Sequence, residues 1–180
     1  MDAAVRAGFR VCEFTLTTPG AMKLIKEFAG KPGLVIGAGT VLTREQAREA
    51  AGQGARFLVS PVMDEEVIDE AVKLGVAMIP GCATPTEMLR AHRAGAAFQK
   101  LFPAPGTGPA WVAQTLAPLP FLRIVPTSGV TIENVGAYLR AGAFAVGFVN
   151  SLFEPADVAC ERWEAIEQRG RAALDVVRAV

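Results

Sequence analysis

The chain has 180 residues, of which 51% are hydrophobic and 20% are charged, so it can bury a substantial core and is not a disordered segment. Lysine plus arginine equals aspartate plus glutamate at 18 each, which excludes the net field that recruits nucleic acid or an anionic membrane. Three widely spaced cysteines, a single histidine and the lack of a long apolar run argue against a disulfide framework, a zinc site and a membrane span. We expect a cytoplasmic protein that needs no metal.

Short apolar runs recur roughly every 20 to 26 residues, and each is followed by an amphipathic stretch. Most runs are apolar on both faces, as is typical of parallel strands that are covered by helices. The pattern therefore predicts strands that alternate with helices along the whole chain. The predicted strands lie within residues 10–16, 33–41, 55–62, 76–82, 97–104, 123–130 and 144–152.

Helix start signals follow several of these runs. Thr18-Pro19 predicts an N-cap with proline at the first helical position, and Thr43 and Thr84 each begin a capping box. A helix predicted over residues 65–75 has its apolar residues mostly along one face, namely Val67, Ile68, Ala71, Val72 and Leu74. One long helix is predicted over residues 156–178, with four apolar residues near one side, namely Trp163, Ile166, Ala173 and Val177.

This alternation predicts either a doubly wound sheet or an α/β barrel of the (β/α)8 TIM type. No Gly-x-Gly-x-x-Gly turn follows the first strand, which argues against a dinucleotide fold, and the regular period favours the barrel. Only seven strands are counted, and residues 2–8 read as the end of a helix. We therefore expect residues 1–180 to form a single barrel domain, comprising strands 2–8 and a C-terminal helix, from which the first strand and most of the first helix are missing.

Away from the ends of the predicted strands, in the strand cores, the ionisable residues are Glu13 and Lys100. In a barrel of this type the active site is at the carboxyl ends of the strands. Lys100 stands in an otherwise apolar run, and apolar surroundings lower the pKa of a lysine, so that neutral amine is available to attack a ketone. A carboxylate such as Glu13 can then move the protons. A lysine and a carboxylate are the minimum set of functional groups for Schiff-base chemistry, which needs no metal.

Each of these residues also has a purely structural interpretation. Lys100 can equally be a surface lysine with a buried stem, and Glu13 can be an edge residue or a salt-bridge partner of Lys100. The GAGT segment, residues 37–40, can be a tight turn, and residues 126–130 can be either a turn or a loop that holds phosphate. Cys82, at a strand end, is expected to be an inert packed thiol.

Six motifs follow one another along the chain. They are EFTLTT (13–18), IGAGTVLT (36–43), VSPV (59–62), IPGCATPTE (79–87), FQKLFPA (98–104) and PTSGV (126–130). In this order they resemble the 2-keto-3-deoxy-6-phosphogluconate (KDPG) / 4-hydroxy-2-oxoglutarate (KHG) aldolase family. The resemblance implies a class I aldolase on an eight-stranded barrel, usually a homotrimer. It also implies cleavage of a KDPG-like 2-keto-3-deoxy sugar acid, or of 4-hydroxy-2-oxoglutarate, to pyruvate and an aldehyde.

The resemblance further implies roles for individual residues. Lys100 matches the Schiff-base lysine and Glu13 the general acid/base, so the covalent intermediate forms without a cofactor. The substrate-binding residues that it implies are Thr40 and Pro61 at the pyruvate end, Phe102 beyond the lysine, Thr127, Ser128 and Gly129 in the loop for the distal group, and Ser151 near the phosphate.

Three positions depart from the family pattern. Thr17 stands where the fullest motif has an arginine that helps to hold a substrate carboxylate, and a hydroxyl cannot replace a bidentate guanidinium. Ser128-Gly129 and Val149-Asn150 stand where the phosphogluconate enzymes have glycine pairs, which leaves the phosphorylation of the substrate open. Two alternatives to an aldolase follow: decarboxylation of a short oxo-diacid through the same enamine, and an inactive or truncated barrel relative.

Overall fold

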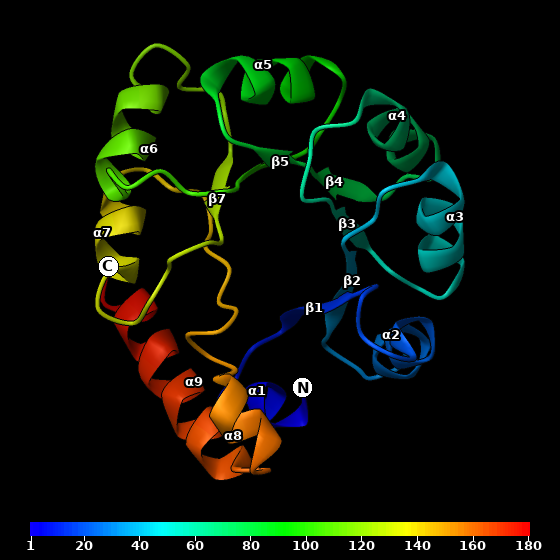
Figure 1. Cartoon of the computed structure of the whole chain (residues 1–180), viewed down its shortest axis with the longest axis vertical. Coiled ribbons are helices and arrows are strands. Elements are labelled where there is room, and N and C mark those ends of the chain that lie inside the picture. The colour runs from blue at the N-terminus through cyan, green and yellow to red at the C-terminus, as the bar shows by residue number, and fades with distance from the viewer. The chain divides into compact units, whose positions relative to one another are not determined.

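The computed structural model describes residues 1–180 as two compact units (Figure 1). One unit consists of Arg10–Pro103, and the other combines Met1–Phe9 with Ala104–Val180. No helix in either unit has the length and apolar character that crossing a membrane requires.

The unit Arg10–Pro103 alternates strands and helices as the apolar periodicity predicts. In Figure 1 its helices lie on the outer side of the arc that its strands make. Its strands are β1 (Val11–Thr15), β2 (Val35–Gly39), β3 (Phe57–Val59), β4 (Ala77–Ile79), β5 (Gly81–Cys82) and β6 (Gln99–Leu101), and its helices are α2 (Ala21–Ala29), α3 (Arg44–Gly52), α4 (Glu65–Lys73) and α5 (Pro85–Arg93).

The strands of this unit pair in parallel in chain order. β1, β2, β3 and β4 form one sheet in that order, and β5 pairs with β6. β4 and β5 are two halves of the strand predicted at 76–82, interrupted at Pro80. The ladder nevertheless continues through the interruption, because the amides of Phe98, Lys100 and Phe102 donate to the carbonyls of Met78, Pro80 and Cys82 at 2.9–3.3 Å.

The alternation of side chains along β1 fixes which residues face the helices. Cys12 and Phe14 are buried, and the Phe14 ring meets the ring of Phe28 from α2 edge to face, with centroids 5.2 Å apart. Because successive side chains of a strand point to opposite faces, Glu13 and Thr15 lie on the other face of the sheet. The strand therefore presents its one carboxylate away from the helix layer.

The helix start signals are confirmed at two of three positions. The hydroxyls of Thr43 and Thr84 accept the amides of Gln46 and Glu87. Thr84 forms the predicted capping box, whereas at Thr43 the box is incomplete, because the Gln46 side chain accepts the amide of Leu42 instead. Thr18 is not a cap, and α2 begins only at Ala21. The hydroxyl of Thr18 instead lies 3.1 Å from the hydroxyl of Thr15, three residues earlier at the end of β1.

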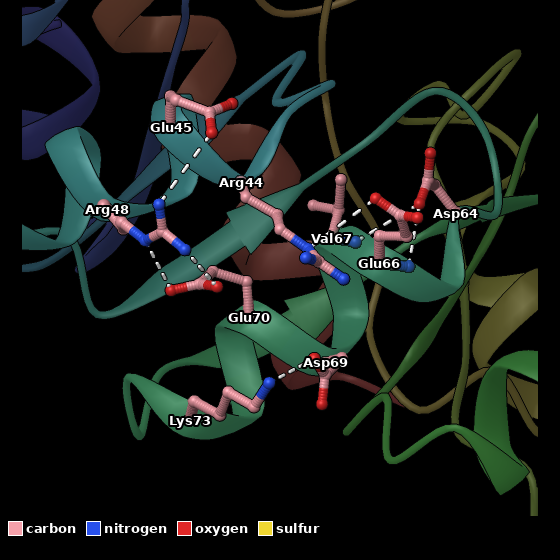
Figure 2. A network of polar contacts seen from close by, with 9 residues as sticks. All are labelled: Arg44, Glu45, Arg48, Asp64, Glu66, Val67, Asp69, Glu70 and Lys73. Atoms are coloured by element: carbon pink, nitrogen blue, oxygen red, sulfur yellow. Dashed lines mark hydrogen bonds and ion pairs between the residues drawn. The ribbon is translucent and has the colours of Figure 1, made fainter.

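Helix α4 packs beside α3 through both apolar and ionic contacts. Val67, Ile68 and Ala71 are buried as predicted, whereas Val72 and Leu74 are exposed, so the predicted apolar face is narrower than expected. Figure 2 shows Arg48 of α3 donating from two nitrogens to Glu70 of α4, at 2.8 and 2.9 Å. This bidentate pair gives the mostly buried Glu70 carboxylate a charged partner.

The other unit is mainly helical. Helix α1 packs along α9, where Arg6 forms an ion pair with Glu167 at 2.7 Å, and a small core joins Ala3, Ala4, Leu152 and Ile166. Its elements are α1 (Asp2–Ala7), α6 (Pro109–Leu116), β7 (Ile124–Pro126), α7 (Val135–Arg140), α8 (Pro155–Ala159) and α9 (Trp163–Arg178).

Two predicted elements of this unit are wrong. The run 144–152 forms no regular strand, because its bonded amides, those of Phe144 and Gly147, are three residues apart while their acceptors, Ile124 and Pro126, are two apart. The extra residue interrupts the ladder as a bulge does.

The predicted helix 156–178 is divided into α8 and α9 at Glu161, whose φ is 53°. A left-handed backbone angle cannot continue a right-handed helix. Trp163 accordingly lies at the start of α9 and is 41% exposed, whereas Ile166 and Ala173 are buried.

A buried carboxylate joins α8 to α9. Asp157 accepts a hydrogen bond from Arg169 at 2.6 Å and lies 2.7 Å from Nε of Arg162. The hydrogen bond from Arg169, together with the charge of Arg162, holds the pKa of Asp157 below its ordinary value. A carboxyl group whose pKa is lowered in the folded state stabilises it above the unfolded-state pKa, and this contribution is lost as the pH falls through the folded-state pKa.

Replacing Asp157 with asparagine is therefore expected to lower the free energy of unfolding at pH 7, with a difference from wild type that shrinks below about pH 4. Urea unfolding at pH 7 and near pH 3 measures both differences. Asp175→Asn is the matched control, because Asp175 is exposed and meets only Arg178 at 3.3 Å. A loss of stability in Asp157→Asn that does not change with pH would contradict the assignment.

Candidate active site

The two ionisable residues predicted from the sequence both lie in the unit Arg10–Pro103. Glu13 is in the middle of β1, and Lys100 is in the middle of β6 between the buried Gln99 and Leu101. Alternation along β6 therefore directs Lys100 to the face opposite these buried side chains. The backbone amide of Lys100 donates to the carbonyl of Pro80 at 2.9 Å, and Lys100 pairs with Gly81 of β5 in the parallel ladder.

Burial is the main cause of the pKa shifts of Lys100 and Glu13. Desolvation lowers the pKa of Lys100, and the nearby charge of Glu13 opposes that shift. Desolvation likewise raises the pKa of Glu13, and the charge of Lys100 opposes it. The residues thus interact through space without forming an ion pair, so the salt-bridge interpretation does not describe them.

Phe102 follows Lys100 closely along the chain, and Thr40 directly follows Gly39, where a Cβ would meet the Glu13 carboxylate. Nζ of Lys100 is 4.6 Å from the centre of the Phe102 ring, a distance at which an ammonium is attracted to an aromatic face. Thr40 follows β2 directly and has a φ of 61°, an unusual conformation for a β-branched residue. GAGT is not a tight turn, since its first three residues belong to β2.

Pro61 owes its position to a glycine. A Cβ on Gly81 would lie only 2.2 Å from the Pro61 carbonyl oxygen, so the backbone after β3 passes directly over Gly81. Gly81 in turn pairs with Lys100. The absence of a side chain at Gly81 therefore lets the Pro61 backbone approach the strand next to Lys100.

Thr17 belongs to a small cluster of hydroxyls at the end of β1. It donates to the Thr15 hydroxyl at 3.0 Å, and Thr15 and Thr18 lie 3.1 Å apart. The exposed Thr17 brings no positive charge to this end of the strand.

The remaining four predicted site residues lie in the other unit. Thr127, Ser128 and Gly129 follow β7, and Gly129 has a φ of 72°, which favours glycine. The hydroxyls of Thr127 and Ser151 are buried without a hydrogen-bond partner. Buried hydroxyls normally have partners, so these two are available to a polar ligand.

Sequence reasoning missed Gly81 and also Asn134, which fixes the loop after β7. The Asn134 side chain donates to the Gly129 carbonyl and accepts the Thr131 amide, both at 2.8 Å. A signal for Asn134 was present, because an asparagine shortly before a helix often bonds to the preceding backbone. Gly81 gave no such signal, since its role depends on strand pairing.

The arrangement suits nucleophilic attack by the Lys100 amine better than attack by the Cys82 thiol. Cys82 is an inert thiol, as expected, because burial raises its pKa to about 12. No group of three or more His, Cys, Asp or Glu side chains is placed to hold a metal ion. A half-buried amine with a lowered pKa and a nearby carboxylate can form a Schiff base with a ketone and exchange protons on the adjacent carbon.

Comparison with known proteins supports the same Schiff-base chemistry. A family model described as KDPG and KHG aldolase matches residues 1–169. The 2-dehydro-3-deoxy-6-phosphogalactonate aldolase of Escherichia coli K12 is 33% identical over 99% of this chain and 85% of its own length.

Two solved structures are also similar. A native KDPGal structure has a TM-score of 0.89 and 33% identity, covering 99% of this chain and 86% of its own. The KDPG aldolase of Legionella pneumophila, with pyruvate captured as a covalent carbinolamine intermediate, has a TM-score of 0.87 and 28% identity, covering 96% and 84%. These neighbours confirm the predicted fold class, an α/β fold of the (β/α)8 TIM type; the missing first strand stays a prediction. The chain belongs to the KDPG and KHG aldolase family and is a carbon–carbon lyase, a class I pyruvate aldolase.

Proposed function

We propose that this aldolase cleaves a 2-keto-3-deoxy-6-phospho sugar acid, with Lys100 as the Schiff-base residue and Glu13 as the proton carrier. The observation that carries the proposal is a half-buried lysine whose Nζ lies 4.6 Å from the centre of the Phe102 ring, on the strand β6 and within electrostatic range of the Glu13 carboxylate. The covalent pyruvate adduct of the relative from Legionella pneumophila supports the same chemistry.

The reaction begins when the neutral Nζ of Lys100 attacks the C2 ketone of the substrate, and the resulting carbinolamine loses water to give an iminium ion. The iminium draws the electrons of the C3–C4 bond toward nitrogen as a base removes the C4 hydroxyl proton. The C3–C4 bond breaks, the aldehyde leaves, and an enamine of pyruvate remains on Lys100. Glu13 protonates C3 of the enamine, directly or through one water, and hydrolysis releases pyruvate and the free lysine.

We assign different residues to the two ends of the proposed substrate, the pyruvate moiety and the phosphate. Thr40, Pro61 and Phe102 are the residues of the Lys100 unit that we assign to the pyruvate moiety. For the phosphate we propose Thr127 and Ser151, whose buried hydroxyls lack partners, with the loop at Ser128 and Gly129. The galacto configuration is our first choice because the relative from Escherichia coli is named for it. A homotrimer in the cytoplasm is proposed from the family alone.

Replacing Ser151 with alanine is expected to raise the KM for a phosphorylated substrate and to leave the KM for 4-hydroxy-2-oxoglutarate unchanged, because only the former brings phosphate oxygens to the hydroxyl. Steady-state assays of pyruvate release measure both. The panel includes the phosphorylated galactonate and gluconate epimers, 4-hydroxy-2-oxoglutarate and oxaloacetate.

Thr115→Val is a suitable control, since Thr115 is a buried residue of α6 in the same unit and belongs to none of the assigned groups. Preferred turnover of oxaloacetate would replace the aldolase proposal by decarboxylation through the same enamine. Equal KM changes for phosphorylated and unphosphorylated substrates in Ser151→Ala would contradict the phosphate assignment.

A further inference from the structure

The Glu13 carboxylate occupies space that a side chain on β2 would fill. A Cβ on Gly39 would lie 1.7 Å from Oε1 of Glu13, 2.6 Å from its Cδ and 3.1 Å from its Cγ. In the register of β1 and β2, Glu13 pairs with Gly37 and Thr15 pairs with Gly39. The Glu13 side chain therefore leans along the sheet toward the carboxyl end of the strands and lies over Gly39.

Backbone conformation does not explain why residue 39 is a glycine. Its φ is outside the left-handed region, unlike that of Gly33 or Gly54, so an alanine is compatible with the backbone. Gly37, two residues earlier, faces the Phe57 ring, whose nearest atom would lie 2.3 Å from a Cβ on that glycine. At Gly39 the atom that excludes a side chain is the oxygen of the carboxylate itself.

Nothing polar in the protein holds this carboxylate in place. The only influences on its pKa are burial and the charge of Lys100, and it takes part in no hydrogen bond or ion pair. Its position is consequently determined by packing. The space above Gly39 that a Cβ would fill, here called the slot, adjoins its terminal atoms on the β2 side.

We propose that Gly39 is a positioning residue for the proton-transferring carboxylate, because the space left by its missing Cβ holds Glu13 where it acts on the Lys100 adduct. This inference rests on the proposed function. A methyl group at position 39 drives the flexible end of Glu13 out of the slot while the backbone stays in place. The fold survives, and the proton transfer is impaired.

Gly39→Ala is expected to lower the rate of deuterium exchange into the methyl group of pyruvate by about 10²-fold, the cost of a displacement of roughly 1 Å in a catalytic group. The thermal midpoint and the final yield of pyruvate trapped on Lys100 by borohydride should stay close to wild type. Gly52→Ala is the matched control in the same unit, because a Cβ at Gly52 meets nothing within 4 Å.

A double-mutant cycle with Glu13→Ala separates positioning from a general structural role. Without the carboxylate there is nothing to displace, so adding Gly39→Ala to Glu13→Ala should cause no further loss of exchange. An undiminished loss in that background, or wild-type exchange in Gly39→Ala alone, would overturn the proposal.

A titration of Glu13 by carbon-13 NMR tests the slot without relying on activity. In wild type, burial raises the pKa of Glu13, and in Gly39→Ala the displaced carboxyl group should titrate closer to an ordinary glutamate. An unchanged titration would refute the slot even if the enzyme proved inactive. Failure of wild type to trap pyruvate would instead remove the proposed function and leave this titration as the test.

Discussion

Lys100→Ala is expected to abolish cleavage, with a fall in kcat of about 10⁴-fold or more, as for other nucleophiles whose removal eliminates the covalent route. The physical reason is that no other amine takes the place of Nζ on β6, where burial favours the neutral form. Pyruvate release from the preferred substrate of the panel measures the loss, and circular dichroism shows whether the variant is folded.

Two further variants test whether the loss of activity is due to the amine of Lys100 and not to the loss of a positive charge or of any lysine. Lys100→Arg keeps a positive charge but has no amine that can attack, so it should be as inactive as the alanine variant. Lys73→Ala removes an exposed lysine that pairs with Asp69 on α4, and it should keep full activity. Substantial cleavage by Lys100→Ala would contradict a Schiff base at this residue.

Glu13→Gln is expected to lower kcat by about 10²–10⁴-fold, the usual contribution of a positioned general acid or base. The amide has nearly the same size as the carboxyl group, so the fold and the binding of the keto acid should be preserved. Pyruvate should still become trapped on Lys100, because the amine remains. Exchange of the pyruvate methyl protons should fall in parallel with kcat.

The same variant has a second, electrostatic consequence with a defined sign. The Glu13 charge raises the pKa of Lys100 against the larger effect of burial. Removing that charge lets the pKa of Lys100 fall further, so the rise of borohydride trapping with pH should move to lower pH. Glu49→Gln, on the helix α3, should leave both the rate and the pH profile unchanged. A profile that moves to higher pH in Glu13→Gln would contradict the pairing of these residues.

The sequence was sufficient to predict the parts of the fold that depend on local composition. Six apolar runs became strands because their apolar residues form buried ladders, and Thr43 and Thr84 cap helices through contacts only three residues away. Glu13 and Lys100 could be recognised because an ionisable group in an apolar strand is costly unless it is used.

The errors have different physical origins. Thr18 makes a local hydroxyl contact with Thr15 and caps no helix, two outcomes that the Thr-Pro pattern does not distinguish, whereas the segment after Phe144 lost its ladder to one extra residue between amides bonded to a distant strand. The place of Gly39 under Glu13 depends on the register of two strands and on the direction in which a side chain leans. Features of this kind are seen only in the three-dimensional structure.

The most direct test of a Schiff base at Lys100 is to incubate the protein with pyruvate and borohydride and to locate the adduct by peptide mass spectrometry. We expect one reduced pyruvyl group, carried by Lys100 and therefore blocking tryptic cleavage after that residue, and no adduct in Lys100→Ala. An adduct on another lysine, or none on a folded protein that cleaves its substrate, would contradict this expectation.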